Sequence, residues 1–249
     1  MSGHSKWHSI KHRKAAADAK RGKLFTKVIK ELTIAARMGG GDTSANPRLR
    51  TAIAAAKSVS MPSDNIERAI RKGSGELEGV DYLDVMYEGY GPGGMAVILE
   101  CVTDNKNRTV AELRYLFGKN GGHLGENGCV AWMFERQGVI RTSAGAADEN
   151  RVFEVAVDAG ATDVRDDGGT LTVVTPADAL EGVRAALVAA GVQVATAEIT
   201  FEPKNSVTLA GEDAAKALKL LDLLEDHDDV QRVSANFDID DEELRRLSA

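Results

Sequence analysis

The residues of this chain with the most evident chemical potential are the lysines and arginines near its amino end. Residues 1–30 contain nine of them against a single acid, Asp18, so this segment carries a formal charge of +8. Residues 1–72 carry +11 and the remainder carries −18, within a total of −7. Concentrated cations attract polyphosphate by displacing condensed counterions, whereas an acidic body repels it. The segregation of charge therefore predicts a nucleic-acid partner.

Most of the candidate contact residues lie in residues 1–23, which we call the basic arm. Contacts to phosphate position a protein on nucleic acid without reading its sequence. Trp7 can stack on a base or anchor the arm on the protein, and both remain open. Arg48 and Arg50 are candidates for a helix that reads DNA. The predicted nucleic-acid-binding residues are Lys6, Trp7, Lys11, His12, Arg13, Lys14, Lys20, Arg21, Lys23, Lys27, Arg48 and Arg50.

Metal binding and catalysis find little support in the residue pattern. His4, His8 and His12 have a spacing that can bind a metal from one helix face, but neighbouring lysines would repel a cation. The acidic clusters at 166–167, 226–229 and 238–243 are interpreted as solvated turns or chain end. Neither a Gly-x-Ser-x-Gly nor a His-Glu-x-x-His motif occurs. We expect no catalytic residues, no metal, no cofactor and no enzymatic activity.

Glycines and cysteines give weaker signals. The glycines at 89–94 lack the Gly-Lys-Ser/Thr ending of a phosphate-binding loop and precede a strand, so they predict a turn. Residues 121–128 are either a binding loop or a tight return to a strand. Cys101 and Cys129 are expected to be free thiols in strands. With no export signal and no apolar run of about 18 residues, the expected location is the cytoplasm, or an organelle matrix if a targeting segment has been lost.

The elements that must position these residues begin with helices. Apolar residues recur at helical spacing from Leu24 to Ala36, and the glycines at 39–41 end that helix. Asn46-Pro47 is a helix start, with Asn46 as the cap. Pro62 opens a third helix, with Gly73 just past its end. Residues 1–78 are therefore predicted to form a basic arm and a helical domain.

The rest of the chain predicts two α/β domains. Strands are expected at 85–90, 96–103 and 129–134, with a helix after Asp104 or Asn105. Residues 136–201 have the β-α-β-β-α-β order of a ferredoxin-like unit. The remaining β-α-β tail completes the preceding sheet, so 79–135 and 202–249 form one discontinuous domain. The predicted fold class is α+β multidomain, an N-terminal three-helix domain followed by two ferredoxin-like α/β domains.

Several long and irregular motifs resemble the YebC/PmpR family from end to end. They are GHSKW, IKH and DAKRGK within 3–23, NPRLR and MPSDNIERAI within 46–70, YEGYGPGG at 87–94, TDNKNRT at 103–109 and LGENG at 124–128. Ser60 and His123 depart from the family pattern without affecting any assignment. The resemblance implies a helical domain followed by two α/β domains, and it brings no catalytic residues.

The resemblance also implies two competing roles. Bacterial relatives are usually described as DNA-binding transcriptional regulators. A mitochondrial relative is a translational activator of cytochrome c oxidase, and some bacterial members resemble ribosome-associated factors. We expect a DNA-binding transcriptional regulator, with an RNA- or ribosome-associated translation factor as the alternative and a protein-docking scaffold below both. The expected partner is nucleic acid, DNA or ribosomal RNA, with no membrane and no small-molecule substrate.

Overall fold

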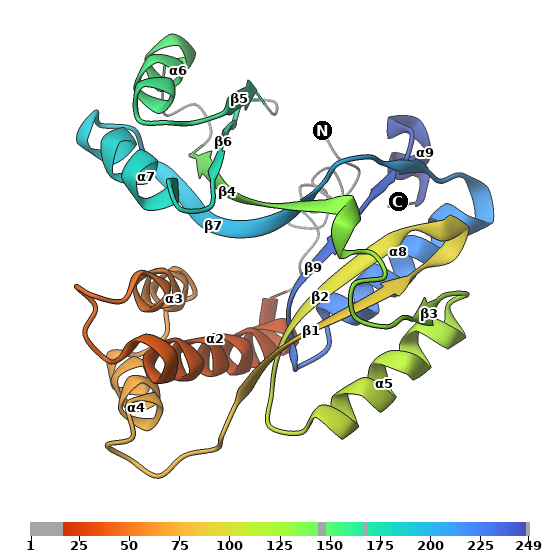
Figure 1. Ribbon diagram of the computed structural model, residues 1–249, viewed down its shortest axis with the longest axis horizontal. Helices are drawn as coiled ribbons and strands as arrows, with labels where there is room; N and C mark the ends of the chain where they lie inside the picture. Colours follow the sequence, from red (N-terminus) through yellow and green to blue (C-terminus); the bar gives the residue numbers. More distant parts are fainter. Residues whose placement is uncertain (1–16, 144–147, 167–168, 248–249) are drawn as a thin grey trace. The chain divides into compact units, whose positions relative to one another are not determined.

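The computed structural model describes residues 17–143, 148–166 and 169–247. It shows an α+β protein in which three helices precede two four-stranded antiparallel sheets with their helices (Figure 1). This confirms the fold class predicted from the sequence. None of the helices in the described residues is long and apolar enough to cross a membrane.

The chain folds into two compact units. We call residues 134–202 the inserted unit, and the described residues before and after it the main unit. Buried side chains of the main unit form two hydrophobic clusters, one among the N-terminal helices and one beneath the first sheet. A third cluster consists of residues from the inserted unit. Each unit therefore has a core of its own.

Three helices begin the main unit. They are α2 (Ala17–Gly39), α3 (Pro47–Ser58) and α4 (Ser63–Gly73). The Asn46 side chain accepts a hydrogen bond from the Leu49 backbone N–H at 3.0 Å, which confirms the predicted cap. Gly73 is the last residue of α4, and it is buried where a methyl group would collide with the Thr33 carbonyl of α2. Close packing of the two helices therefore requires glycine at this position.

The first sheet of the main unit has the strand order β3-β1-β2-β9. Its strands are β1 (Leu83–Tyr90), β2 (Ala96–Thr103), β3 (His123–Leu124) and β9 (Val230–Ala235). Helices α5 (Lys106–Lys119) and α8 (Gly211–Glu225) pack Phe117 and Leu221 into the core beside it. The pairing of β2 with β9 joins segments more than one hundred residues apart.

Shorter elements complete the main unit and include one departure from expectation. The strand predicted at 129–134 is wrong, because η2 (Ala131–Met133) lies there and a strand begins only at Phe134. The reason is that the Val130 and Ala131 N–H groups donate to the Glu88 carboxylate instead of to a neighbouring strand. The remaining short elements are η1 (Pro92–Gly94), β8 (Val207–Thr208), β10 (Phe237–Asp238) and α9 (Asp241–Leu247).

The inserted unit follows the β-α-β-β-α-β order predicted for it. Its elements are β4 (Phe134–Thr142), α6 (Glu149–Asp158), β5 (Asp163–Asp166), β6 (Leu171–Pro176), α7 (Leu180–Ala189) and β7 (Val194–Pro203). The strand order β5-β6-β4-β7 gives this sheet a different arrangement from the first one, where the β1–β2 hairpin is central. Ile140, Val173 and Leu187 are fully buried in its core.

The chain leaves and re-enters the main unit at one point. The backbone N–H of Lys204 donates to the Met133 carbonyl at 2.9 Å, and the Lys204 ammonium donates to the Trp132 carbonyl at 3.2 Å. The two ends of the inserted unit are thus held side by side by residues of the main unit.

Candidate nucleic-acid interface

The basic arm falls largely outside the described residues. The predicted contact residues in that part are Lys6, Trp7, Lys11, His12, Arg13 and Lys14. Lys20 and Arg21 lie in the first two turns of α2, where the structure places the backbone. The described part of the candidate interface therefore starts at Lys23.

Three lysines of α2 share one helix face and bind the carboxyl end of α8 and the turn that follows it. Lys23 donates to the Asp226 carbonyl at 3.2 Å, and Lys27 donates to the Glu225 carbonyl. Lys30 donates to the Asp228 carbonyl at 3.0 Å. The last carbonyls of a helix lack partners within the helix and carry partial negative charge, so cations stabilise them. We call residues 225–229 the acidic turn and these three lysines the lysine row.

The strongest contact of the lysine row is a buried ion pair. The Lys30 ammonium lies 2.6 Å from Oδ1 of Asp229, and both side chains are less than one tenth exposed. Oδ2 of Asp229 accepts from Arg108 at 2.9 Å and from Thr109 at 2.7 Å. Burial alone would raise the pKa of Asp229, but hydrogen bonds from Lys30, Arg108 and Thr109 hold it well below its usual range. This network fastens α2 to α5 and to the segment before β9.

A histidine beside this network has metal-ligand neighbours but no spare nitrogen. Glu112, His227 and Asp229 bring their ligand atoms within 4.8 Å of one another. The Asp229 N–H donates to Nδ1 of His227 at 3.1 Å, which leaves Nε2 to donate to Glu112 at 2.9 Å. With Asp229 bound by two cationic side chains, the group is built as a hydrogen-bonded network and not as a cation site.

The two arginines predicted on α3 make internal contacts. Arg48 donates to both oxygens of Glu31 at 2.7 and 3.0 Å and to both oxygens of Asp84 at 2.5 and 3.1 Å. Burial alone would lower the pKa of Arg48, but the hydrogen bonds that it donates to Glu31 and Asp84 raise it above its ordinary value. Arg50 donates to the carbonyls of Thr43 and Ser44 at 2.7 and 2.9 Å. The structure thus brings Lys23 and Lys27 together and places Arg48 and Arg50 in separate contacts.

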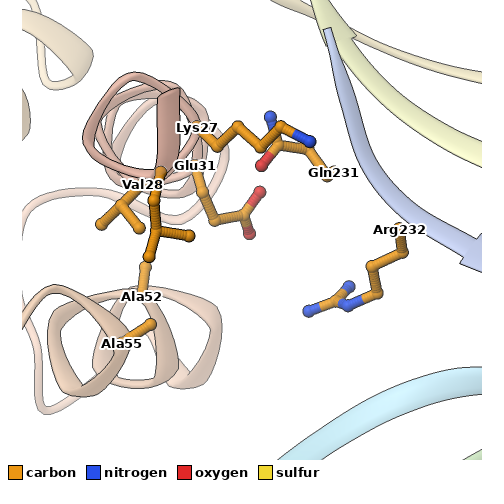
Figure 2. A pocket seen from close by; sticks show the side chains of 8 residues that line it. Lys27, Val28, Glu31, Ala52, Ala55, Gln231 and Arg232 are labelled. Carbon is orange, nitrogen blue, oxygen red and sulfur yellow. The ribbon is translucent and has the colours of Figure 1, made fainter. Parts of the chain in front are cut away.

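A groove lies next to the lysine row and was not predicted from the sequence. Lys27 and Glu31 of α2, Ala52 and Ala55 of α3, and residues of β9 line it (Figure 2). Burial lowers the pKa of Lys27 to about 8, although the carboxylates of the acidic turn act in the opposite direction. The lysine spacing of four and three was visible in the sequence, but its partners in β9 and the acidic turn were not.

The glycine-rich segments form turns of the backbone. Gly93 and Gly94 have φ values of +63° and +78°, which suits the predicted turn. The segment 121–128 is a tight return, since the Gly125 N–H donates to the Glu88 carbonyl at 2.8 Å. The buried Glu88 carboxylate also accepts from the Gly128 N–H at 2.7 Å. This carboxylate fixes the loop against β1.

Both cysteines are free thiols, as predicted. Cys101 lies in β2, where burial raises its pKa to about 12, so it stays protonated and unreactive. Cys129 lies in the loop before η2 and not in a strand, contrary to expectation.

Comparison with known proteins covers almost the whole chain. Residues 5–76 match the TACO1/YebC protein N-terminal domain, and residues 82–237 match the TACO1/YebC second and third domain. A protein of Desulforapulum autotrophicum named as a probable transcriptional regulatory protein is 56% identical over 97% of this chain and 98% of its own length. One of Geobacter sulfurreducens with the same name is 56% identical over 99% and 100%.

A solved structure extends the similarity to three dimensions. The crystal structure of a conserved hypothetical protein from Aquifex aeolicus superposes with a TM-score of 0.85 at 48% identity. The match covers 92% of this chain and 94% of that protein.

Proposed function

Because the chain belongs to the TACO1/YebC family, we propose that it is a DNA-binding transcriptional regulator that grips the phosphate backbone through its basic arm. The observation that carries this proposal is the segregation of charge, +11 over residues 1–72 against −18 over the rest. The names of the relatives support a regulatory role without catalysis. The proposed location is the cytoplasm.

The lysine row narrows the proposed contact surface. Lys27 and Lys30 already bind the acidic turn, and Arg48 binds two carboxylates. Cations that are paired within the protein have less to gain from a phosphate. Lys23 also donates to the acidic turn. The proposal therefore rests on the arm residues before α2, with Lys20 and Arg21 extending the surface along the helix.

RNA is the second candidate partner, in a ribosome-associated role in translation. The observation that favours it is the surface of α4, the helix that follows α3 across a short turn. Its first two turns expose Asp64 and Glu67. Acidic side chains at that end oppose entry into a DNA major groove, where helix-turn-helix proteins place the amino end of the second helix. A cationic arm suits RNA, which is often read by shape and backbone.

The salt dependence of binding tests the phosphate contacts. We expect the substitution of Lys6, Lys11, Arg13 and Lys14 by Gln to reduce the slope of log affinity against log salt by about 3 to 4 for duplex DNA. A matched control neutralises four exposed arginines, Arg151, Arg165, Arg245 and Arg246. The measurement is fluorescence anisotropy between 50 and 200 mM salt. Equal slopes for the two quadruple variants would show that these arm residues do not contact phosphate.

The choice between DNA and RNA needs a measurement in cells. Crosslinking followed by sequencing of the bound nucleic acid separates them. Recovery of promoter DNA supports the transcriptional regulator, and recovery of ribosomal RNA supports the translation factor.

A further inference from the structure

The groove beside the lysine row has the size and lining of a binding site for a small flat group. Its volume is about 170 Å³. A cavity of about 150 Å³ in another protein admits a benzene ring. Half of the lining is apolar, from Leu24, Val28, Ala52 and Ala55. The other half is polar, from Lys27, Glu31, Gln231 and Arg232.

One polar atom of this lining lacks a partner. Nε2 of Gln231 is buried, and among the described residues nothing accepts a hydrogen bond from it. Buried amide groups in proteins are almost always hydrogen-bonded, because an unmet donor is unfavourable. Because Nε2 is closed off from solvent in the structure, a ligand in the groove bonds to it only if the Gln231 side chain turns toward the ligand.

The groove also offers an acceptor. Glu31 is held in place by Arg48, which donates to each of its oxygens. A carboxylate has about four acceptor positions, so two bonds from Arg48 leave capacity for a ligand N–H. Figure 2 shows Glu31 between the α3 alanines and the two β9 residues. A ligand edge that carries both donors and acceptors would therefore find complementary groups.

Positive charge and position connect the groove to the basic arm. Lys27 and Arg232 both line it. Lys27 already donates to the Glu225 carbonyl, and Arg232 lies 3.9 Å from the Glu100 carboxylate, so an anionic group of a ligand would share them with these partners. Leu24 lies seven residues after the start of α2 at Ala17, which is about 10 Å along the helix. A nucleic-acid backbone held by the arm and the first turns of α2 thus passes close to the groove.

We propose that the groove receives one unpaired base from a single-stranded segment of the bound nucleic acid. A base has two apolar faces and an edge of donors and acceptors, and unpaired bases can turn outward to use them. The eight described lining residues include no aromatic ring, so aliphatic side chains hold the base where other proteins stack it. This inference depends on the proposed function, because the arm delivers the nucleic acid.

A pair of neighbouring alanines on α3 provides the test. Ala54 and Ala55 are both exposed, but only Ala55 lines the groove. Ala55→Phe would fill the groove, and Ala54→Phe adds the same ring outside it. The probes are an unstructured single-stranded RNA and the blunt duplex of the same sequence, with affinity measured by anisotropy at 100 mM salt.

The expected result is a selective loss. Ala55→Phe should weaken single-strand binding by about tenfold and leave duplex binding unchanged, while Ala54→Phe changes neither. Gln231→Leu, which removes the amide without adding bulk, should weaken single-strand binding about five- to tenfold, the effect of one lost hydrogen bond. The Gln231→Leu variant tests the same inference if Ala55→Phe does not fold.

Other outcomes overturn the inference in distinguishable ways. Equal single-strand affinities for Ala54→Phe, Ala55→Phe and the unaltered protein would exclude a base from the groove while arm binding stands. An equal loss for duplex and single strand on filling the groove would also exclude it. If the unaltered protein binds neither of these probes, the inference fails alone; if it also fails to bind duplex DNA in a salt-dependent way between 50 and 200 mM salt, the proposed function fails together with it.

Discussion

Asp229 shows how much depends on one buried carboxylate. It accepts hydrogen bonds from Lys30, Arg108 and Thr109, and it is only 2% exposed. Removing its charge would leave the Lys30 ammonium buried without an anion. Breaking a buried pair by removing one partner is far more damaging than losing an exposed pair.

We expect Asp229→Asn to lower the free energy of unfolding by about 3–5 kcal/mol at pH 7. Since the pKa of Asp229 is depressed in the folded state, its contribution is fully present above its unfolded pKa, about 3.9. Below that pH the unfolded carboxyl takes up a proton first, so the difference between the two proteins should shrink by about 1.4 kcal/mol per pH unit.

Urea denaturation at pH 7, 5 and 3.5 measures this difference. Glu112→Gln is the matched control, because Glu112 is half exposed and bonds to His227 in the same network. Its effect should stay within about 1 kcal/mol. A difference between Asp229→Asn and the unaltered protein that is small, or that grows on acidification, would contradict the role of the buried pair.

At the scale of elements, the three N-terminal helices owe their arrangement to close backbone approach. Gly73 ends α4 against α2, where a methyl group would lie 2.8 Å from Cβ of Ala36 and would strike the Thr33 carbonyl. Gly118 in α5 has open space around it. The same substitution should therefore have opposite effects at the two sites.

We expect Gly73→Ala to lower the free energy of unfolding by about 1–3 kcal/mol through overpacking. Gly118→Ala should raise it by about 0.5–1 kcal/mol, because alanine favours a helix over glycine. Chemical denaturation of both variants checks the signs. Stabilisation by Gly73→Ala would show that α2 and α4 do not pack as closely as described.

The same scale shows what the sequence could predict. The caps Asn46 and Asn105 were readable because each accepts a hydrogen bond from a backbone N–H three residues away. Residues 129–134 do not form the predicted strand because the backbone there is hydrogen-bonded to Glu88, some forty residues earlier. Signals within one helical turn are visible in a sequence, whereas a distant partner for a buried group is not.

The candidate site follows the same rule. The density of cations in the first thirty residues could be counted directly. The contacts of Lys27 and Lys30 with the acidic turn join residues about 200 positions apart in the sequence. The same separation applies to Gln231, which lines the groove beside them. No local pattern marks such a pairing.

At the scale of the whole molecule, the chain passes from the main unit into the inserted unit after Met133 and returns to it at Pro203. Met133 and Lys204 are hydrogen-bonded to each other through their backbones. The buried residues of the two main-unit clusters come from residues before 134 or after 202. The main unit therefore has the contacts that it needs for its own stability.

We expect a protein in which residues 134–202 are replaced by two or three glycines to fold cooperatively. It should also keep the salt-dependent binding of duplex DNA, because the basic arm remains. Thermal denaturation and the anisotropy titration measure the two properties. Loss of cooperative unfolding would mean that the core of the main unit is incomplete without residues 134–202.

The contacts of the lysine row have a consequence for biosynthesis. Lys23, Lys27 and Lys30 are made early, and the carbonyls and carboxylate that receive them are made about 200 residues later. Until the acidic turn leaves the ribosome, this cationic helix face has no internal partner in a nascent chain surrounded by RNA phosphate. Docking of α2 onto the acidic turn therefore has to wait until the polypeptide is nearly complete.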